Sequence, residues 1–116
     1  MPHSVFSSSR RQMPRRRVSI EVMLWSQQQR TQGLIVDLAE GGCRLSCEES
    51  LPLRCEMHLR FDLPFSETTI RCDGRIVWAS QEKSGAGVEF LRMSEVDRRR
   101  ILHWLDNNAA AGEIVS

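Results

Sequence analysis

Two short stretches of the sequence carry the side chains best suited to binding chemistry. The first is SRRQMPRRRV, residues 9–18, which holds five arginines and no acidic residue. A guanidinium group is planar, donates two parallel hydrogen bonds to phosphate and stacks on flat rings, whereas a lysine ammonium is a point charge. Fifteen of the sixteen basic residues in the chain are arginine. The stretch therefore favours a partner that carries phosphates or aromatic rings over a purely nonspecific basic tail.

The second stretch is VDLAEGG, residues 36–42, at the end of an expected strand. Alternation with its apolar neighbours places Asp37 on the face away from the core, and two glycines follow. Glycine allows a ligand to approach the backbone closely. A carboxylate there can accept hydrogen bonds from the N–H donors of a base such as guanine, or orient an arginine. The plain alternative is a strand that ends in a glycine turn.

The other reactive side chains give no support for catalysis. The cysteines have no C-x-x-C spacing and fall at inward positions of the strand pattern, which indicates free thiols that pack in the core rather than a metal or redox site; they are Cys43, Cys47, Cys55 and Cys72. The three histidines are scattered, and no hydrolase or metalloprotease motif is present. We expect no enzyme activity, no metal and no cofactor.

Charge is distributed unevenly along a chain of 116 residues with a formal net charge of +1. Residues 1–20 carry +5, and the other 96 residues, with eleven basic and fifteen acidic side chains, carry −4. The length fits one domain with one core. No apolar run reaches the roughly 20 residues that span a bilayer, and no signal peptide precedes the arginines. We therefore expect a cytoplasmic protein without membrane insertion.

The remaining pattern predicts three parts: a flexible arm over 1–17, a domain over 18–106 and a tail over 107–116. Alternating apolar residues indicate about six short strands. Their expected inward positions include Leu34, Val36 and Leu38, then Leu53 to Phe61, then Ile76 with Trp78. Ser94 and Asp97 form a capping box for a helix of about three turns. Hairpin-length turns predict an all-β, antiparallel barrel or sandwich with this helix packed on it.

The two binding stretches together resemble the PilZ domain family. Its pattern is Arg-x-x-x-Arg, followed about 20–30 residues later by Asp or Asn-x-Ser-x-x-Gly. Here RQMPR (11–15) fits the first motif, and DLAEGG (37–42) fits the second at its first and last positions, with Ala39 in place of the serine. The resemblance covers residues 10–106 and includes the GRIVW strand, the GAGVEF strand and the final helix. It implies a six-stranded split barrel.

This resemblance implies a bacterial receptor for the second messenger cyclic di-GMP. Arg11 and Arg15, with Arg10 beside them, would bind the phosphates and guanine from an arm that closes over the ligand. Asp37, Ala39 and Gly42 would receive a guanine edge. Trp78 resembles an aromatic residue that borders the ligand in some members, although as a continuation of the face of Ile76 it would equally be a core residue. Ligand binding would order the arm and change the surface offered to a downstream protein.

Two other functions fit the sequence. The missing hydroxyl at Ala39 removes a hydrogen bond worth about 0.5–1.5 kcal/mol, which leaves open a PilZ-like interaction module that binds no nucleotide. The basic arm also fits a small nucleic-acid-binding barrel, but an outward stacking platform of aromatic residues is not evident in the sequence, so nucleic acid is the less expected partner. The DRRR run (97–100) fits a solvated helix face or a partner-binding one.

Overall fold

The computed structural model describes residues 15–80 and 85–107; residues 1–14, 81–84 and 108–116 lie outside this part. Most of the expected arm, including Arg10 and Arg11, is therefore outside it. The described elements are β1 (Arg15–Trp25), β2 (Arg30–Ala39), β3 (Gly42–Ser46), β4 (Glu56–Asp62), β5 (Thr69–Ser80), β6 (Gly85–Arg92) and α2 (Glu95–Asn107). No helix among these residues is long and apolar enough to cross a membrane.

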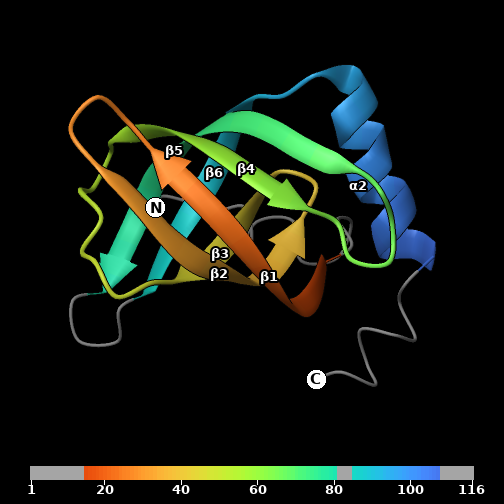
Figure 1. Ribbon diagram of the computed structural model, residues 1–116, viewed down its shortest axis with the longest axis horizontal. Helices are drawn as coiled ribbons and strands as arrows, with labels where there is room; N and C mark the ends of the chain where they lie inside the picture. The colour runs from red at the N-terminus through yellow and green to blue at the C-terminus, as the bar shows by residue number, and fades with distance from the viewer. Residues whose placement is uncertain (1–14, 81–84, 108–116) are drawn as a thin grey trace, which may run out of the picture.

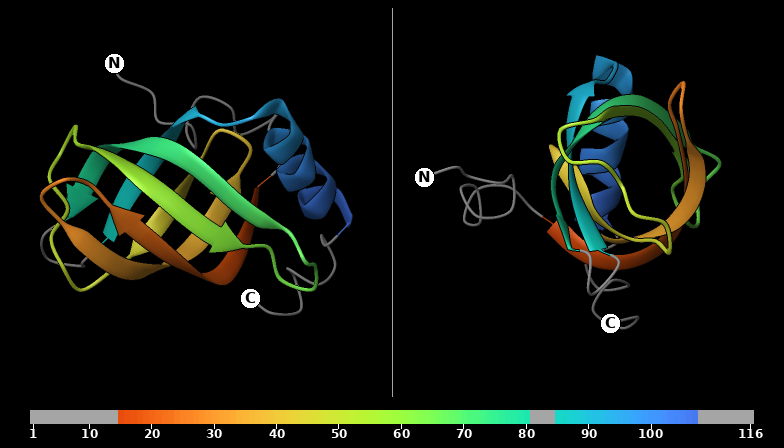
Figure 2. Two further views of the ribbon diagram at one scale, coloured as in Figure 1. Left: turned by 45° about the horizontal axis from the view of Figure 1, so that its top comes forward. Right: turned by 90° about the vertical axis from the view of Figure 1, so that its left-hand side faces the viewer.

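The strands form a closed antiparallel barrel in the order β1-β2-β3-β6-β5-β4, in which β4 pairs back to β1. Figure 2 (right) looks along the barrel and shows the ring of strands with α2 beyond it, and Figure 1 shows α2 at one end. The predicted six strands and C-terminal helix are confirmed, as a barrel rather than a sandwich. β1 begins at Arg15, whereas alternation alone predicts a start at Val18.

The barrel core follows from side chains that alternate between the two faces of each strand. β4 shows this most regularly, because Met57, Leu59 and Phe61 are buried while the residues between them are exposed. α2 contributes Ile101, Trp104 and Leu105 to the same core.

One hydrogen bond caps α2, and another ties it to the barrel. The Asp97 N–H donates to Ser94 Oγ at 3.0 Å, which confirms the predicted cap of the helix. The Trp104 indole Nε1–H donates to the Pro64 carbonyl at 2.7 Å and so ties the helix to the loop between β4 and β5. The helix therefore has a defined start and a defined contact with the barrel.

A β-bulge in β2 makes the faces of its side chains differ from the predicted ones. Ile35 pairs with Leu45, and the next pair is Asp37 with Arg44, so Val36 is an extra residue in the strand. Such a residue reverses the alternation beyond it. Ile35 is fully buried, and the prediction that Leu34 points inward is wrong, since Leu34 is 39% exposed. Leu38 lies in the core as predicted.

Two further predictions of inward residues are wrong. Leu53 was expected in a strand, but it lies in a loop before β4 and is 57% exposed, next to Arg54 at a positive φ of 69°. Trp78 does not continue the face of Ile76, because a second bulge at Val77 turns its side chain outward. The bulge thus removes the core alternative for Trp78.

We predict that one thiol of the folded protein reacts readily with a disulfide reagent. Cys43, Cys47 and Cys72 are buried, and burial raises the pKa of each; that of Cys72 rises to about 12, with Asp73 and Asp97 adding to the effect. Cys55 is half-buried. Thiolate is the reactive form. In buffer, one thiol per chain, that of Cys55, should therefore react rapidly with the reagent, and in denaturant all four should react. Four rapid equivalents in buffer would contradict the buried placement.

Candidate functional site

The bulges in β2 and β5 bring Asp37 and Trp78 onto one outer row of the barrel wall. In the strand pairing Asp37 lies opposite Arg17 of β1 on one side and opposite Arg44 of β3 on the other. Arg44 pairs in turn with Gly87 of β6, and Gly87 with Trp78 of β5. Paired residues on one face of a sheet are direct neighbours. The row therefore joins two guanidinium groups, a carboxylate and an indole across five strands.

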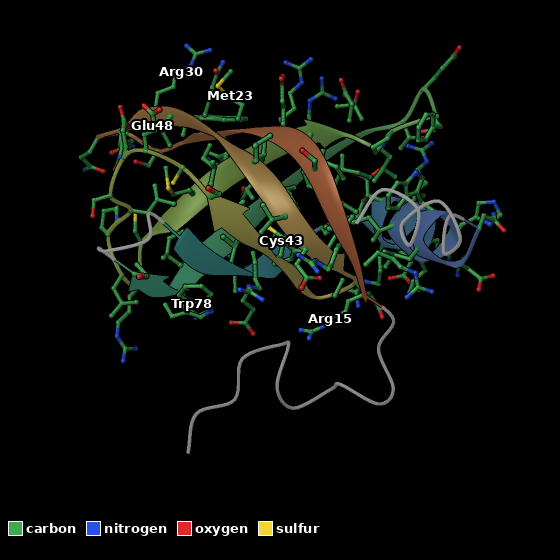
Figure 3. The ribbon with its side chains drawn as sticks, turned by 90° about the horizontal axis from the view of Figure 1, so that it is seen from below. Arg15, Met23, Arg30, Cys43, Glu48 and Trp78 are labelled. Atoms are coloured by element: carbon green, nitrogen blue, oxygen red, sulfur yellow. The ribbon has the colours of Figure 1, made fainter. Side chains whose placement is uncertain are left out.

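A second row runs beside the first and holds the other residues expected at the site. Arg15 lies opposite Ala39, and Ala39 lies opposite Gly42. Ala39 is 1% exposed. Figure 3 shows Arg15 and Trp78 on the same side of the barrel, with Cys43 in the wall between them. The structure thus brings together Arg15, Asp37, Ala39, Gly42 and Trp78, while Arg10 and Arg11 lie outside the described residues.

Asp37 is a buried carboxylate with one oxygen unused. Its side chain is 9% exposed, and Oδ2 lies 3.8 Å from Nη1 of Arg44. Oδ1 is buried and accepts no hydrogen bond within the described part of the chain. A buried polar atom left without a partner costs about 1–3 kcal/mol. Oδ1 is therefore an acceptor to which a ligand donor would add a favourable bond.

Burial dominates the electrostatics of Asp37. Loss of water raises the pKa of its carboxyl above the ordinary value, and the nearby charges of Arg15, Arg44 and Arg17, with a backbone N–H of Leu38, oppose this only in part. Three cations around one carboxylate leave the cluster with an excess of positive charge. The site consequently suits a ligand that brings both hydrogen-bond donors and negative charge.

Trp78 lies flat on the wall because β6 has glycine beneath it. A Cβ atom on Gly87 would come within 2.6 Å of Trp78 Cδ1, so only glycine leaves room for the ring. The guanidinium carbon of Arg44 lies 6.0 Å from the centroid of the Trp78 ring, which is within the range of a cation–π contact. Arg44 thus stands between the ring and the carboxylate, in contact range of both.

Arg17 and Arg44 join this site through strand pairing and not through a sequence motif. Neither belongs to the two motifs. Arg44 did carry a signal, since it alternates with the buried Cys43 and Leu45 directly after the second motif. Arg17 lies opposite Asp37 only because pairing between β1 and β2 is irregular between Arg17 and Ile20, which alternation does not predict.

The turn that carries the second motif also contacts the helix. Glu40 Oε2 lies 3.7 Å from Nη1 of Arg98 in α2, and the Phe90 N–H donates to the Gly41 carbonyl at 2.9 Å. The arginines of the DRRR run form ion pairs within the protein. Arg98 pairs with Glu40 and Glu95, and Arg100 pairs with Asp97. Much of its charge is thus balanced within the protein.

Sequence comparison gives one family. Residues 9–107 match the profile of the PilZ domain. A search of curated proteins found no match.

Solved structures share the fold at low sequence identity. The PilZ domain of YcgR from Escherichia coli with c-di-GMP is 13% identical, with a TM-score of 0.71 over 91% of this chain and 97% of that one. The inhibitor of motility MotI/DgrA of Bacillus subtilis is 15% identical, with a TM-score of 0.72 over 87% of this chain. The chain spans about half of that protein, 52%. The PilZ domain of CeSA from a cellulose-synthesizing bacterium gives 0.61 at 15% identity, over 80% of this chain and 95% of that one.

We predict that Asp37→Asn stabilises the folded protein at pH 7. The folded-state pKa of Asp37 lies above the ordinary value of 3.8, so the folded state binds the proton more tightly. The free energy of unfolding then falls as pH rises through the interval between the two pKa values. The asparagine variant removes this loss, and thermal unfolding followed by circular dichroism should show a higher Tm than the unmodified chain at pH 7.

The difference in Tm between the Asp37→Asn variant and the unmodified chain should shrink at pH values below 3.8, where Asp37 is protonated in both the folded and the unfolded state. Glu48→Gln is the control, because it makes the same change of charge at an exposed side chain. A Tm for Asp37→Asn at pH 7 equal to or below that of the unmodified chain would contradict a raised pKa.

Proposed function

The chain belongs to the PilZ domain family, whose members are receptor and adaptor domains that include cyclic di-GMP receptors, and we propose that it binds cyclic di-GMP on the outer row of its barrel. The observation that carries the proposal is Asp37, a buried carboxylate with a free oxygen among Arg15, Arg17 and Arg44. A cyclic dinucleotide offers N–H donors to Oδ1 of Asp37 and negative charge to the surrounding arginines.

Each residue has a role that follows from its chemistry. Asp37 Oδ1 accepts from the N1–H and exocyclic amine of a guanine. Arg15, and Arg11 four residues before it, bind phosphate oxygens through charge-assisted bonds; Arg10 and Arg11 are assigned from their place in the sequence. Gly42 leaves space for the base beside the backbone. These groups bind and orient a ligand and include no nucleophile with a base beside it, which supports a receptor rather than an enzyme.

Arg44 and Trp78 form the flat side of the proposed site. A guanine ring or a guanidinium group can stack on the indole, and Arg44 already lies 6.0 Å from its centroid. Trp78 is half-buried on the wall rather than in the core. This placement supports the ligand role for Trp78 over the core role.

Signal transmission would follow from the position of Arg15 at the start of β1. Contacts of Arg11 and Arg15 with phosphate would order the residues before β1 against the barrel and change the surface offered to a downstream protein, an order–disorder switch.

The second candidate function is a PilZ-like interaction module without nucleotide binding. Ala39 favours it, because this residue lies opposite Arg15 and Gly42 in the site and lacks the hydroxyl of the family motif. Arginines at both positions of the first motif favour the receptor. Titration with the nucleotide separates the two functions.

We predict saturable binding of cyclic di-GMP in isothermal calorimetry and none of GTP at the same concentrations. Arg15→Ala and Asp37→Ala should each weaken binding at least about tenfold, because each removes a charge-assisted bond. Arg99→Ala is the matched control, since Arg99 is a 78% exposed arginine on α2. An absence of heat, with no change of Tm at high ligand concentration, would reject the receptor and leave the interaction module.

A separate prediction concerns the missing hydroxyl. Ala39→Ser should strengthen binding by up to about tenfold, which corresponds to one ordinary hydrogen bond. The same titration measures it, and Ala79→Ser, on an exposed position of β5, should leave the affinity unchanged. Weaker binding by the Ala39→Ser variant would show that the tightly covered side chain has no room for the added oxygen.

A further inference from the structure

Like charges lie side by side in two neighbouring rows on the outer wall of β1, β4 and β5. In the first row Arg60 of β4 is opposite Arg71 of β5. The second row lies on the next outward positions, where Glu21 of β1 and Asp62 of β4 share one level, one step beyond the last pair of these two strands. The wall therefore carries a basic row directly beside an acidic row.

The charges of the two rows are not balanced within the protein. Among the residues that the structure describes, Glu21, Asp62, Arg60 and Arg71 form no ion pair, and all four side chains are exposed. Asp62 accepts one hydrogen bond, from the Thr69 hydroxyl at 2.6 Å. Like charges on adjacent strands at one level destabilise a sheet, whereas opposite charges stabilise it. Folding alone gives no reason to separate the two signs into rows.

A hollow beside the two rows gives room for another molecule. It measures about 1160 Å³, and residues of both rows line it together with Met23 and Leu34. Its other edge carries Arg30 and the glutamates at 48 and 49. Figure 3 shows Met23 and Arg30 on the side of the barrel away from Trp78. The hollow is thus separate from the proposed nucleotide site, and both signs of charge border it.

This mixture of charges excludes a good fit to a partner with one sign of charge. An acidic peptide or a nucleic acid that binds Arg60 and Arg71 meets Glu21 and Asp62 beside them, and a basic partner meets the arginines. Successive outward residues of one strand are only about 7 Å apart, so a partner with several charges cannot contact one row alone. The wall fits an occupant that itself carries an acidic row beside a basic row.

We propose that this wall binds a second copy of the chain face to face, with Asp62 of each copy on Arg60 of the other. A twofold axis that runs across the strands, midway between the two rows, places the acidic row of each copy on the basic row of the other. Both residues lie on β4, so the two β4 strands cross antiparallel and the ion pair forms twice. Face-to-face sheets are about 10 Å apart, which an arginine and an aspartate side chain together can bridge. Glu21 then lies over Met23 of the second copy, next to the same Arg60.

The test is sedimentation velocity of the full chain at concentrations up to about 1 mM, a range that includes weak dimers. The unmodified chain should pass from monomer to dimer as its concentration rises. Arg60→Glu and Asp62→Arg should each weaken the dimer at least about tenfold, because each substitution places like charges on each other at both contacts. An equimolar mixture of the two variants should dimerise again, because each contact in the mixed dimer joins opposite charges.

Arg99→Glu is the matched control, because it makes the same change of charge at a 78% exposed arginine of α2, and it should leave the dimer unchanged. Three outcomes would overturn the proposal. The first is a monomer at every concentration, which would leave the wall to a different protein. The second is a dimer that both variants retain, and the third is a mixture of the two variants that stays monomeric.

The unmodified chain gives a second readout that needs no substitution. An increase of NaCl from about 0.05 M to about 1 M should weaken the dimer severalfold, because salt screens charges that remain close to solvent, and a dimer that salt does not weaken would contradict the proposed contacts. The affinity for cyclic di-GMP should be the same in Arg60→Glu as in the unmodified chain, so the dimer and the proposed function are tested separately. A loss of that affinity would assign Arg60 to the nucleotide site and overturn the proposal.

Discussion

The extra residue at Val36 decides on which side of the barrel wall Asp37 lies. In an uninterrupted strand Asp37 would share the inward face of Ile35, and a carboxylate in an apolar core has a large desolvation penalty. The bulge at Val77 does the same for Trp78, and the pairing of β1 is irregular at the level of Arg17. Irregular pairing in three strands thus builds one site, in line with the frequent occurrence of bulges beside binding sites.

The same site has an electrostatic balance that works against the stability of the fold. Asp37 is nearly covered, so its ionised form loses the solvation that an exposed carboxylate keeps. Nη1 of Arg44 lies 3.8 Å from Oδ2 of Asp37, too far for a short hydrogen bond, and the same guanidinium group also lies near the Trp78 ring. A fold under selection for stability alone would replace such a carboxylate with a neutral side chain. The partners around Asp37 stabilise its charge incompletely, so a ligand of the proposed kind would add a hydrogen bond that the fold leaves unmade.

The elements that the sequence predicts correctly are those whose residue pattern fits only one structure. β4 alternates strictly, and the helix starts at a recognisable cap, so both were found. Leu34, Ile35 and Val36 are three consecutive apolar residues, so their sequence does not show which of them point inward. The bulge among them cannot be recognised from the residue types either. Asp37 and Gly42 are predicted from their motif alone. Arg17 and Arg44 were missed, because cross-strand pairing brings them to the site and a linear motif does not contain that pairing.

The pairing of β1 differs along its length. Its second half, Val22–Trp25, is held between β2 and β4, whereas within the described strands its first half pairs with β2 alone. A strand bonded on both sides is held more firmly than one bonded on one side. Arg15 and Arg17 therefore lie on the half of β1 that is held less firmly, while Met23 and Trp25 lie on the half that is held between two strands. A ligand of the proposed site would thus meet the more adaptable half of the strand.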